Sequence, residues 1–85
     1  MPEISRFFGI TIYMNWRDHP PAHFHAVYGE HEALITLDGT VYSGELPRRA
    51  LSMVREWLAI HRNEIERDWE LASQRKPLNP IEPLE

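Results

Sequence analysis

The sequence contains no cysteine, and this absence removes several kinds of site at once. Disulfide cross-links, thiolate metal sites and a cysteine nucleophile are all excluded. No apolar run approaches the roughly 20 residues that a transmembrane helix requires. The first residues, Met1-Pro2-Glu3, also lack the basic start of a secretory signal. We therefore expect a cytoplasmic protein that does not associate with a membrane.

Positive charge is in short supply as well. Nine Lys and Arg residues stand against thirteen Asp and Glu residues, which gives a formal net charge of −4. This balance argues against a protein that coats nucleic acid through bulk charge alone, while local basic patches stay open. The 85 residues, 42% apolar and 11% aromatic, suffice for one modest core. We expect a single domain over residues 1–85, with a β-sheet block (1–44), a helical block (45–76) and an extended tail (77–85).

The first block shows the two-residue alternation of β-strands, interrupted by turn signals. The alternation is continuous over residues 7–16. Two prolines within residues 17–22 lack backbone N–H donors, so a strand ladder stops there. Gly29-Glu30 and Asp38-Gly39 are typical of two-residue hairpin turns. The predicted sheet is a four-stranded antiparallel meander with strands at 7–16, 23–28, 31–37 and 40–43.

The register of the two hairpins follows if each turn holds two residues. The resulting pairs are Val27 with Glu32, His25 with Leu34, His23 with Thr36, Thr36 with Val41, and Ile35 with Tyr42. One face of the sheet, suited to cover by a helix, then carries Phe24, Ala26, Ala33, Ile35 and Tyr42. The opposite face carries His23, His25, Leu34, Thr36 and Val41.

Helical spacing of apolar residues begins at Pro47, which suits a first helical position, and continues to about Arg75. Such a helix would be roughly 43 Å long, which is long for so small a domain. We expect one long helix that bends near Asn63, two consecutive helices, or an overhang that meets a partner. Together with the sheet, this gives an α+β fold.

The last residues place proline at every third position from Pro77, which matches the three-residue turn of polyproline II. Leu78, Ile81 and Leu84 share one edge of this extended, Pro-rich tail. That edge lies either on the domain's own surface or on another chain.

Chemically reactive side chains are concentrated in Asp18-His19-Pro20-Pro21-Ala22-His23-Phe24-His25. His23 and His25 lie on one strand face, close enough to bind a single Zn²⁺, Mn²⁺ or Fe²⁺ ion, with Asp18 or His19 as a third ligand. A purely structural role for these side chains is the competing interpretation. The sequence thus leaves the divalent metal open.

A metal-free alternative is phosphodiester chemistry. A neutral imidazole would accept a proton from the attacking hydroxyl, and Arg17 would neutralise charge on the phosphate. Arg48 and Arg49, in the first helical turn, are further candidate anion contacts, although solvated surface residues are the plainer explanation. The three tryptophans Trp16, Trp57 and Trp69 are expected in the core, with Trp69 also a candidate anchor for a partner.

Four stretches of the sequence carry a resemblance to a known family. They are residues 1–10, the Asp18–Ala26 segment, the Gly44–Leu51 segment and the Trp69–Ala72 segment. With them the chain resembles a bacterial family catalogued as domain of unknown function 4160. Members of that family are often encoded beside another small protein, in an arrangement similar to a toxin–antitoxin gene pair. The resemblance therefore implies a cytoplasmic protein partner.

Three functions stay open at this point. The leading hypothesis is the toxin-like effector of such a pair, acting on RNA or nucleotide phosphate through His23 and His25 with Arg17 and Asp18 assisting. The second is a non-catalytic protein-binding module or antitoxin-like partner. The third is a small metal-binding protein that uses His23, His25 and Asp18. A homodimer also stays open.

Overall fold

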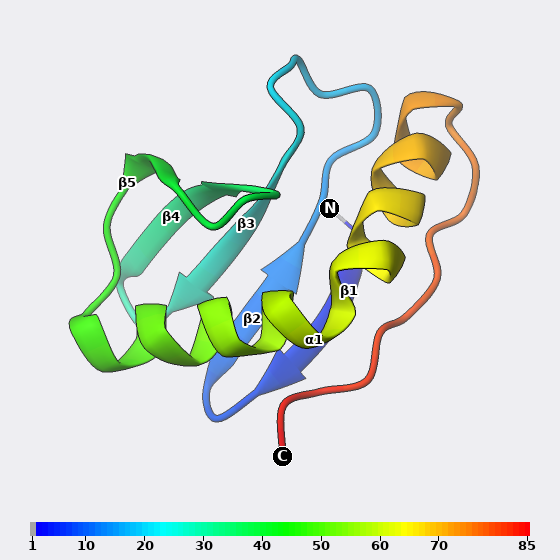
Figure 1. Cartoon of the computed structure of the whole chain (residues 1–85). Coiled ribbons are helices and arrows are strands. Elements are labelled where there is room, and N and C mark those ends of the chain that lie inside the picture. The colour runs from blue at the N-terminus through cyan, green and yellow to red at the C-terminus, as the bar shows by residue number, and fades with distance from the viewer. Residues whose placement is uncertain (1) are drawn as a thin grey trace.

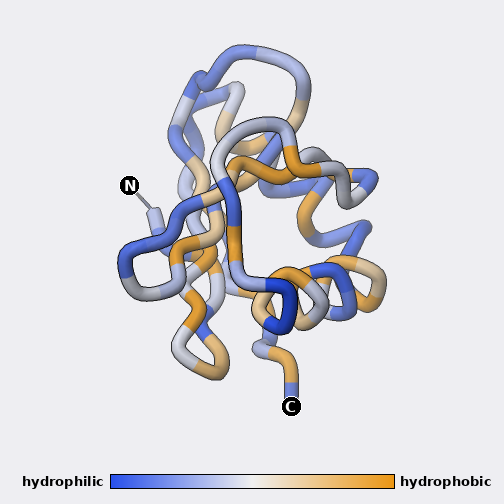
Figure 2. The backbone as a smooth tube through the Cα atoms, turned by 90° about the vertical axis from the view of Figure 1, so that its left-hand side faces the viewer, coloured by the Kyte–Doolittle hydropathy of each residue, from blue (hydrophilic) through white to orange (hydrophobic). Residues whose placement is uncertain are grey.

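The computed structural model describes residues 2–85. Five strands precede one helix along the chain: β1 (Glu3–Phe7), β2 (Ile10–Tyr13), β3 (His23–Tyr28), β4 (His31–Thr36), β5 (Val41–Gly44) and α1 (Arg48–Ser73). The strands form one antiparallel sheet in the order β1-β2-β3-β4-β5. The helix lies against one face of this sheet (Figures 1 and 2). The predicted α+β architecture, an antiparallel sheet followed by one long helix, is confirmed.

The prediction of four strands is wrong, because the alternation over residues 7–16 spans two strands and a turn. Phe8 and Gly9 both have positive φ, 48° and 81°, as the central residues of a type I′ hairpin turn require. A two-residue turn pairs Phe7 with Ile10, and both side chains are buried in the core. Phe7 and Ile10 therefore share a face although three positions separate them, so the turn shifts the phase of the alternation. The apolar Phe8, which is 59% exposed in the turn, hides that shift in the sequence.

The register of the first predicted hairpin is confirmed, and that of the second is wrong. β3 and β4 pair His25 with Leu34 as expected. Between β4 and β5 the loop holds three residues rather than two, since the Thr36 N–H donates to the Thr40 carbonyl at 2.9 Å. Ile35 consequently pairs with Val41, a bulge displaces Tyr42, and Tyr42 is 49% exposed instead of facing the core.

The core lies between the sheet and α1. The indole of Trp57 is fully buried against the rings of Phe7 and Phe24, with ring centroids 5.6 and 5.8 Å away. Trp16 is 48% exposed, so its predicted place in the core is wrong. It follows β2 in a turn, where its indole N–H donates to the Lys76 carbonyl at the surface.

The helix bends at His61, two residues before the predicted position. The His61 backbone leaves helical geometry, with φ −114° and ψ 23°, and its Nδ1 lies 2.6 Å from Glu64 Oε1. The bend redirects the second half of α1 (Figure 1). On that half, the ring of Trp69 packs against the ring of His23, the first residue of β3. Within residues 2–85, no helix combines the length and the apolar character needed to cross a membrane.

After α1 the chain returns along its own domain, in the orange to red trace of Figure 1. The Ile81 N–H donates to the Ile4 carbonyl at 2.7 Å, and the Trp57 indole N–H donates to the Glu82 carbonyl at 2.9 Å. The Asn79 N–H donates to a carboxylate oxygen of the fully buried Asp68, whose pKa burial raises. Of the two predicted locations for the Leu78, Ile81 and Leu84 edge, the structure shows the domain's own surface.

The buried tail contact leads to a stability prediction. Ile81→Ala should lower the free energy of unfolding by about 2–4 kcal/mol, because it removes a side chain that is only 4% exposed. The matched control is Ile60→Ala, at a position 63% exposed, which should change stability by less than about 0.5 kcal/mol. Urea unfolding measures both. Equal effects of the two substitutions would contradict the packing of the tail.

Candidate functional site

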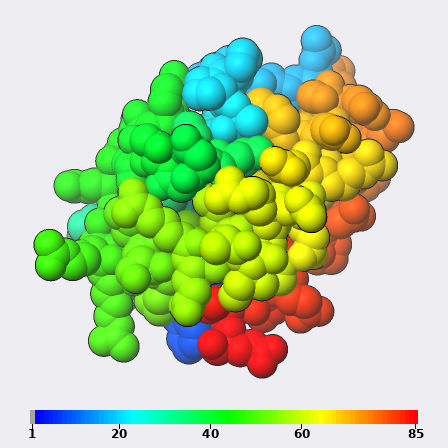
Figure 3. All heavy atoms as spheres, in the orientation of Figure 1, coloured from blue at the N-terminus to red at the C-terminus, as the bar shows by residue number. Residues whose placement is uncertain are grey.

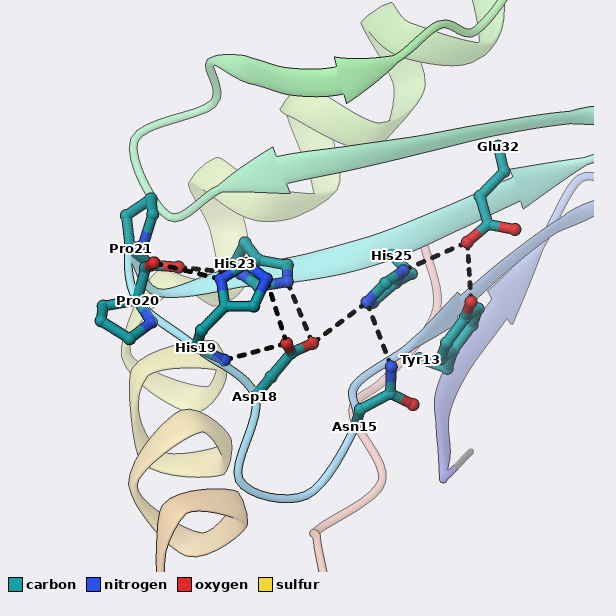
Figure 4. Close-up of polar contacts among 9 residues, drawn as sticks. All are labelled: Tyr13, Asn15, Asp18, His19, Pro20, Pro21, His23, His25 and Glu32. Carbon is teal, nitrogen blue, oxygen red and sulfur yellow. Dashed lines mark hydrogen bonds and ion pairs between the residues drawn. The ribbon is translucent and has the colours of Figure 1, made fainter.

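The His-rich segment places its functional side chains where β3 begins. His23 and His25 are two residues apart on a strand, so they point to the same face, opposite the core residue Phe24. The loop before β3 folds back over this face and sets Asp18 between the two imidazoles (Figure 4). The structure thus brings together the three predicted metal-ligand candidates, Asp18, His23 and His25.

His23 has one nitrogen satisfied and one without a partner. Its side chain is fully buried, and Nδ1 lies 2.8 Å from the Pro21 carbonyl oxygen. A carbonyl oxygen can only accept, so Nδ1 carries a proton, and in the neutral ring Nε2 then presents a lone pair. Nε2 lies 3.1 Å from Asp18 Oδ2, but the two groups do not meet at a hydrogen-bonding angle, and Nε2 has no hydrogen-bond partner.

Both nitrogens of His25 have polar neighbours. Nδ1 lies 3.1 Å from Glu32 Oε2, which also accepts a hydrogen bond from the Tyr13 hydroxyl at 2.7 Å. The Tyr13 ring stacks on the imidazole, with centroids 4.5 Å apart. Nε2 faces the loop, at 3.4 Å from both Asp18 Oδ2 and Asn15 Nδ2. The proton is therefore assigned to Nδ1, and Nε2 points toward Asp18.

The charges around the two imidazoles are set by hydrogen bonds. Partial burial raises the pKa of Asp18, but the His19 amide N–H and the three neighbouring imidazoles outweigh it, so the net shift is downward. The hydrogen bond from Tyr13 is the main cause of the lowered pKa of Glu32. Burial, with Glu32 alongside, raises the pKa of Tyr13 to about 12. At neutral pH the site therefore holds two carboxylates and a neutral phenol.

The distances from Asp18 to the two imidazoles match the spacing of ligands around one small cation. Ligands about 2.0–2.1 Å from a tetrahedral ion lie about 3.3–3.4 Å from one another. Asp18 Oδ2 is 3.1 Å from His23 Nε2 and 3.4 Å from His25 Nε2. One ligand atom from each of the three residues lies within 4.8 Å of the other two. Two nitrogens and one carboxylate oxygen form a ligand set that suits Zn²⁺, Mn²⁺ or Fe²⁺.

His19 lies at the rim of this site. Its side chain is 68% exposed, and its Nε2 is 3.8 Å from Asp18 Oδ1. Its backbone N–H donates to the same oxygen at 2.9 Å, which holds the Asp18 carboxylate in place. His19 therefore contributes through its backbone, while its imidazole faces solvent beside the cluster.

The other predicted site residues lie elsewhere. Arg17 lines a surface groove with Trp16 and Arg75. Arg48 and Arg49 lie in the first turn of α1, on grooves that contain none of the histidines. The Trp69 ring packs 5.5 Å from that of His23, as part of the wall behind the site.

Sequence reasoning missed Glu32 and Tyr13, which hold His25 from behind. A signal for Glu32 was present, because the predicted register places it two residues from Leu34, the partner of His25, and hence on the same face. No such signal existed for Tyr13. Its position opposite His25 depends on the pairing of β2 with β3 across the long loop.

The lowered carboxyl pKa values predict how stability responds to acid. Folding lowers the pKa of Asp18 and Glu32 from 3.8 and 4.5, so the unfolded chain takes up these protons first as the pH falls. The stability they contribute is complete above about pH 4.5 and is lost as the pH falls through the lowered values. Glu32→Gln should therefore be less stable than the wild type by roughly 0.5 kcal/mol at pH 6, since the half-exposed Glu32 is screened by water.

This difference should shrink toward pH 3, where the wild-type carboxylate becomes protonated. Urea unfolding between pH 6 and pH 3, in a chelating buffer, measures it. A difference that is the same at both ends of this range would contradict the role given to Glu32.

Comparison with known proteins bears on the family of the chain. The family described as a domain of unknown function, DUF4160, matches residues 9–70, a span that includes every ligand candidate of the site. No curated protein and no solved structure matches the chain. The resemblance seen in the sequence is confirmed, and the chain belongs to the DUF4160 family.

Proposed function

We propose that the protein binds a divalent transition-metal ion through Asp18 Oδ2 and the Nε2 atoms of His23 and His25. The observation that carries this proposal is His23 Nε2, a fully buried nitrogen without a hydrogen-bond partner beside an ionised carboxylate. A buried polar atom left unpaired costs about 1–3 kcal/mol. A cation bound by both Nε2 and Asp18 would remove that cost, because the Nε2 lone pair would coordinate it.

The groups behind the ligands support the same proposal. Metal-binding imidazoles usually donate their other N–H to a carbonyl or a carboxylate, which fixes the ring and the tautomer. His23 does so to the Pro21 carbonyl, and His25 to the Glu32 carboxylate. The Tyr13 hydroxyl in turn orients Glu32. Both rings are therefore held with Nε2 toward the ion before any ion binds.

Three protein ligands leave at least one coordination position for water or a substrate, which is the arrangement of catalytic rather than structural zinc sites. A divalent ion held by these three residues would supply an activated water as a nucleophile near neutral pH. Asp18 and His19 form the solvent-facing side of the cluster, whereas His23 is sealed from solvent. His23 would thus act on a substrate through the ion rather than by direct contact.

This chemistry suits a small hydrolytic effector. We propose that role for the protein, in a gene pair of the toxin–antitoxin type and with a small cognate protein as its partner. The assignment to such a pair rests on the family resemblance. The hydrolytic part rests on the ligand set, and each part is tested separately.

Metal binding gives the direct test of the proposal. Co²⁺ added to the chelator-treated protein should bind with a stoichiometry of one and give the visible absorption of nitrogen and oxygen ligation. Asp18→Asn and His23→Gln should each weaken binding at least about 100-fold, and Glu32→Gln about 10- to 100-fold, since Glu32 only orients a ligand. His31→Gln is the matched control, because this exposed histidine lies outside the cluster and should leave the affinity unchanged.

Circular dichroism of each variant shows whether the fold is retained. If the fully buried His23→Gln variant unfolds, the partly exposed Asp18→Asn variant still decides the question. An affinity that falls equally in the His31 control, or a wild-type protein that takes up no Co²⁺ or Zn²⁺, would refute the proposed centre.

A further inference from the structure

A second chemical feature lies at the junction between the loop before β3 and the end of α1. Trp16, Arg17 and Arg75 line an open groove of about 460 Å³ there, within the range of roughly 300–1,000 Å³ that small ligands occupy. Figure 3 shows the two segments side by side, the loop in light blue and the helix end in orange. Arg17, which lines the groove, directly precedes the metal-ligand candidate Asp18 in the sequence.

Backbone hydrogen bonds hold the three lining residues in place. The Ala72 carbonyl, at the end of α1, accepts from the backbone N–H of both Arg17 and Arg75, each at 3.1 Å. The Trp16 indole N–H donates to the Lys76 carbonyl, also at 3.1 Å. The backbones of the two arginines are thus held next to each other by a shared acceptor, the Ala72 carbonyl. The indole is fixed beside them rather than free to turn.

The backbone at both arginines is in an unusual conformation. Arg17 and Arg75 have φ values of 53° and 58°, and within residues 2–85 only one other non-glycine residue, Phe8, has a positive φ. This left-handed region is disfavoured for residues other than glycine, asparagine and aspartate. At Arg75 this conformation ends α1 in a Schellman motif, in which the Arg75 N–H donates to the Ala72 carbonyl and the Lys76 N–H to the Leu71 carbonyl. At both arginines the positive φ sets the direction in which the side chain leaves the backbone.

The groove carries two positive side chains without acidic partners, although the chain has a net charge of −4. Four other arginines are engaged: Arg6 and Arg67 in ion pairs, Arg55 and Arg62 with backbone carbonyls. Within residues 2–85, the side chains of Arg17 and Arg75 make no ion pair or hydrogen bond, and no acidic residue lines their groove. Trp16, which lines the same groove, is 48% exposed, while Trp57 is fully buried.

We propose that this groove binds a nucleoside phosphate, with the base stacked on Trp16 and the phosphate held by Arg17 and Arg75. Paired guanidinium groups match phosphate oxygens in geometry and charge, and an indole accepts any base by stacking. A nucleotide carries both partners in one small molecule. A free nucleotide fits better than a long strand, because successive phosphates of a strand would meet an acidic protein. Nucleotide binding by the groove is argued independently of the metal. Only the further step, that the bound nucleotide is the substrate of the metal centre, rests on the proposed function.

Calorimetric titration of the full chain with adenosine monophosphate, in a chelating buffer, tests the groove independently of any metal. The double variant Arg17→Asn/Arg75→Asn removes both charges, and asparagine tolerates the left-handed backbone. It should weaken binding about ten-fold or more, and Trp16→Ala about five-fold or more. The control Arg48→Gln/Arg49→Gln removes two equally unpaired charges elsewhere and should change the affinity less than two-fold. Circular dichroism checks that each variant is folded.

Three results would overturn the proposal: no binding of adenosine monophosphate to the wild type, equal loss in the Arg48/Arg49 control, or equal affinity for a tetraglutamate peptide. A hexa-adenylate that binds more than about ten-fold tighter than the mononucleotide would overturn the choice of a free nucleotide. Nucleotide binding by a protein that takes up no Co²⁺ would support the groove and refute only the metal centre. Metal uptake without nucleotide binding would do the reverse.

Discussion

Burial of an imidazole nitrogen without a hydrogen-bond partner is the constraint on which the site depends. His23 Nε2 is enclosed by protein, next to an ionised Asp18 that it approaches at 3.1 Å without a hydrogen-bonding angle. Its other nitrogen is committed to the Pro21 carbonyl, so the ring cannot turn to satisfy Nε2 without losing that bond. His25 likewise has its Nδ1 beside an acceptor, the Glu32 carboxylate, while its Nε2 lies 3.4 Å from Asp18. A cation is the partner that satisfies both lone pairs and the carboxylate together.

The second half of the fold serves to hold the loop that carries Asp18. The bend at His61 turns the end of α1 toward this loop, where the Ala72 carbonyl takes the Arg17 N–H and the Lys76 carbonyl takes the Trp16 indole. The returning tail then fastens the helix end to the sheet through Ile81. Metal cluster, cationic groove and tail are therefore parts of one arrangement. Because hydrogen bonds attach this loop to the end of α1, the loop can hold Asp18 in the metal cluster and Arg17 in the groove.

Local sequence patterns predicted the parts of this arrangement that depend on neighbours along the chain. Alternation placed His23 and His25 on one face, and the Gly29-Glu30 turn gave the correct register opposite β4. The sequence named Asp18 and His19 as alternative third ligands but could not choose between them, because the path of the loop depends on contacts with residues more than fifty positions later. The errors have physical causes of the same kind. The apolar Phe8 in the first turn hides the change of phase between β1 and β2, and one extra loop residue near Asp38 moves Tyr42 to the surface.

The protonation of the two imidazoles tests the central claim most directly. Long-range proton–nitrogen NMR spectra distinguish Nδ1 from Nε2 in each ring, before and after one equivalent of Zn²⁺. The account predicts that His23 and His25 carry their protons on Nδ1, and that zinc moves their Nε2 signals while His31 stays unchanged. A proton on His23 Nε2, donated to Asp18 and unaffected by zinc, would contradict it.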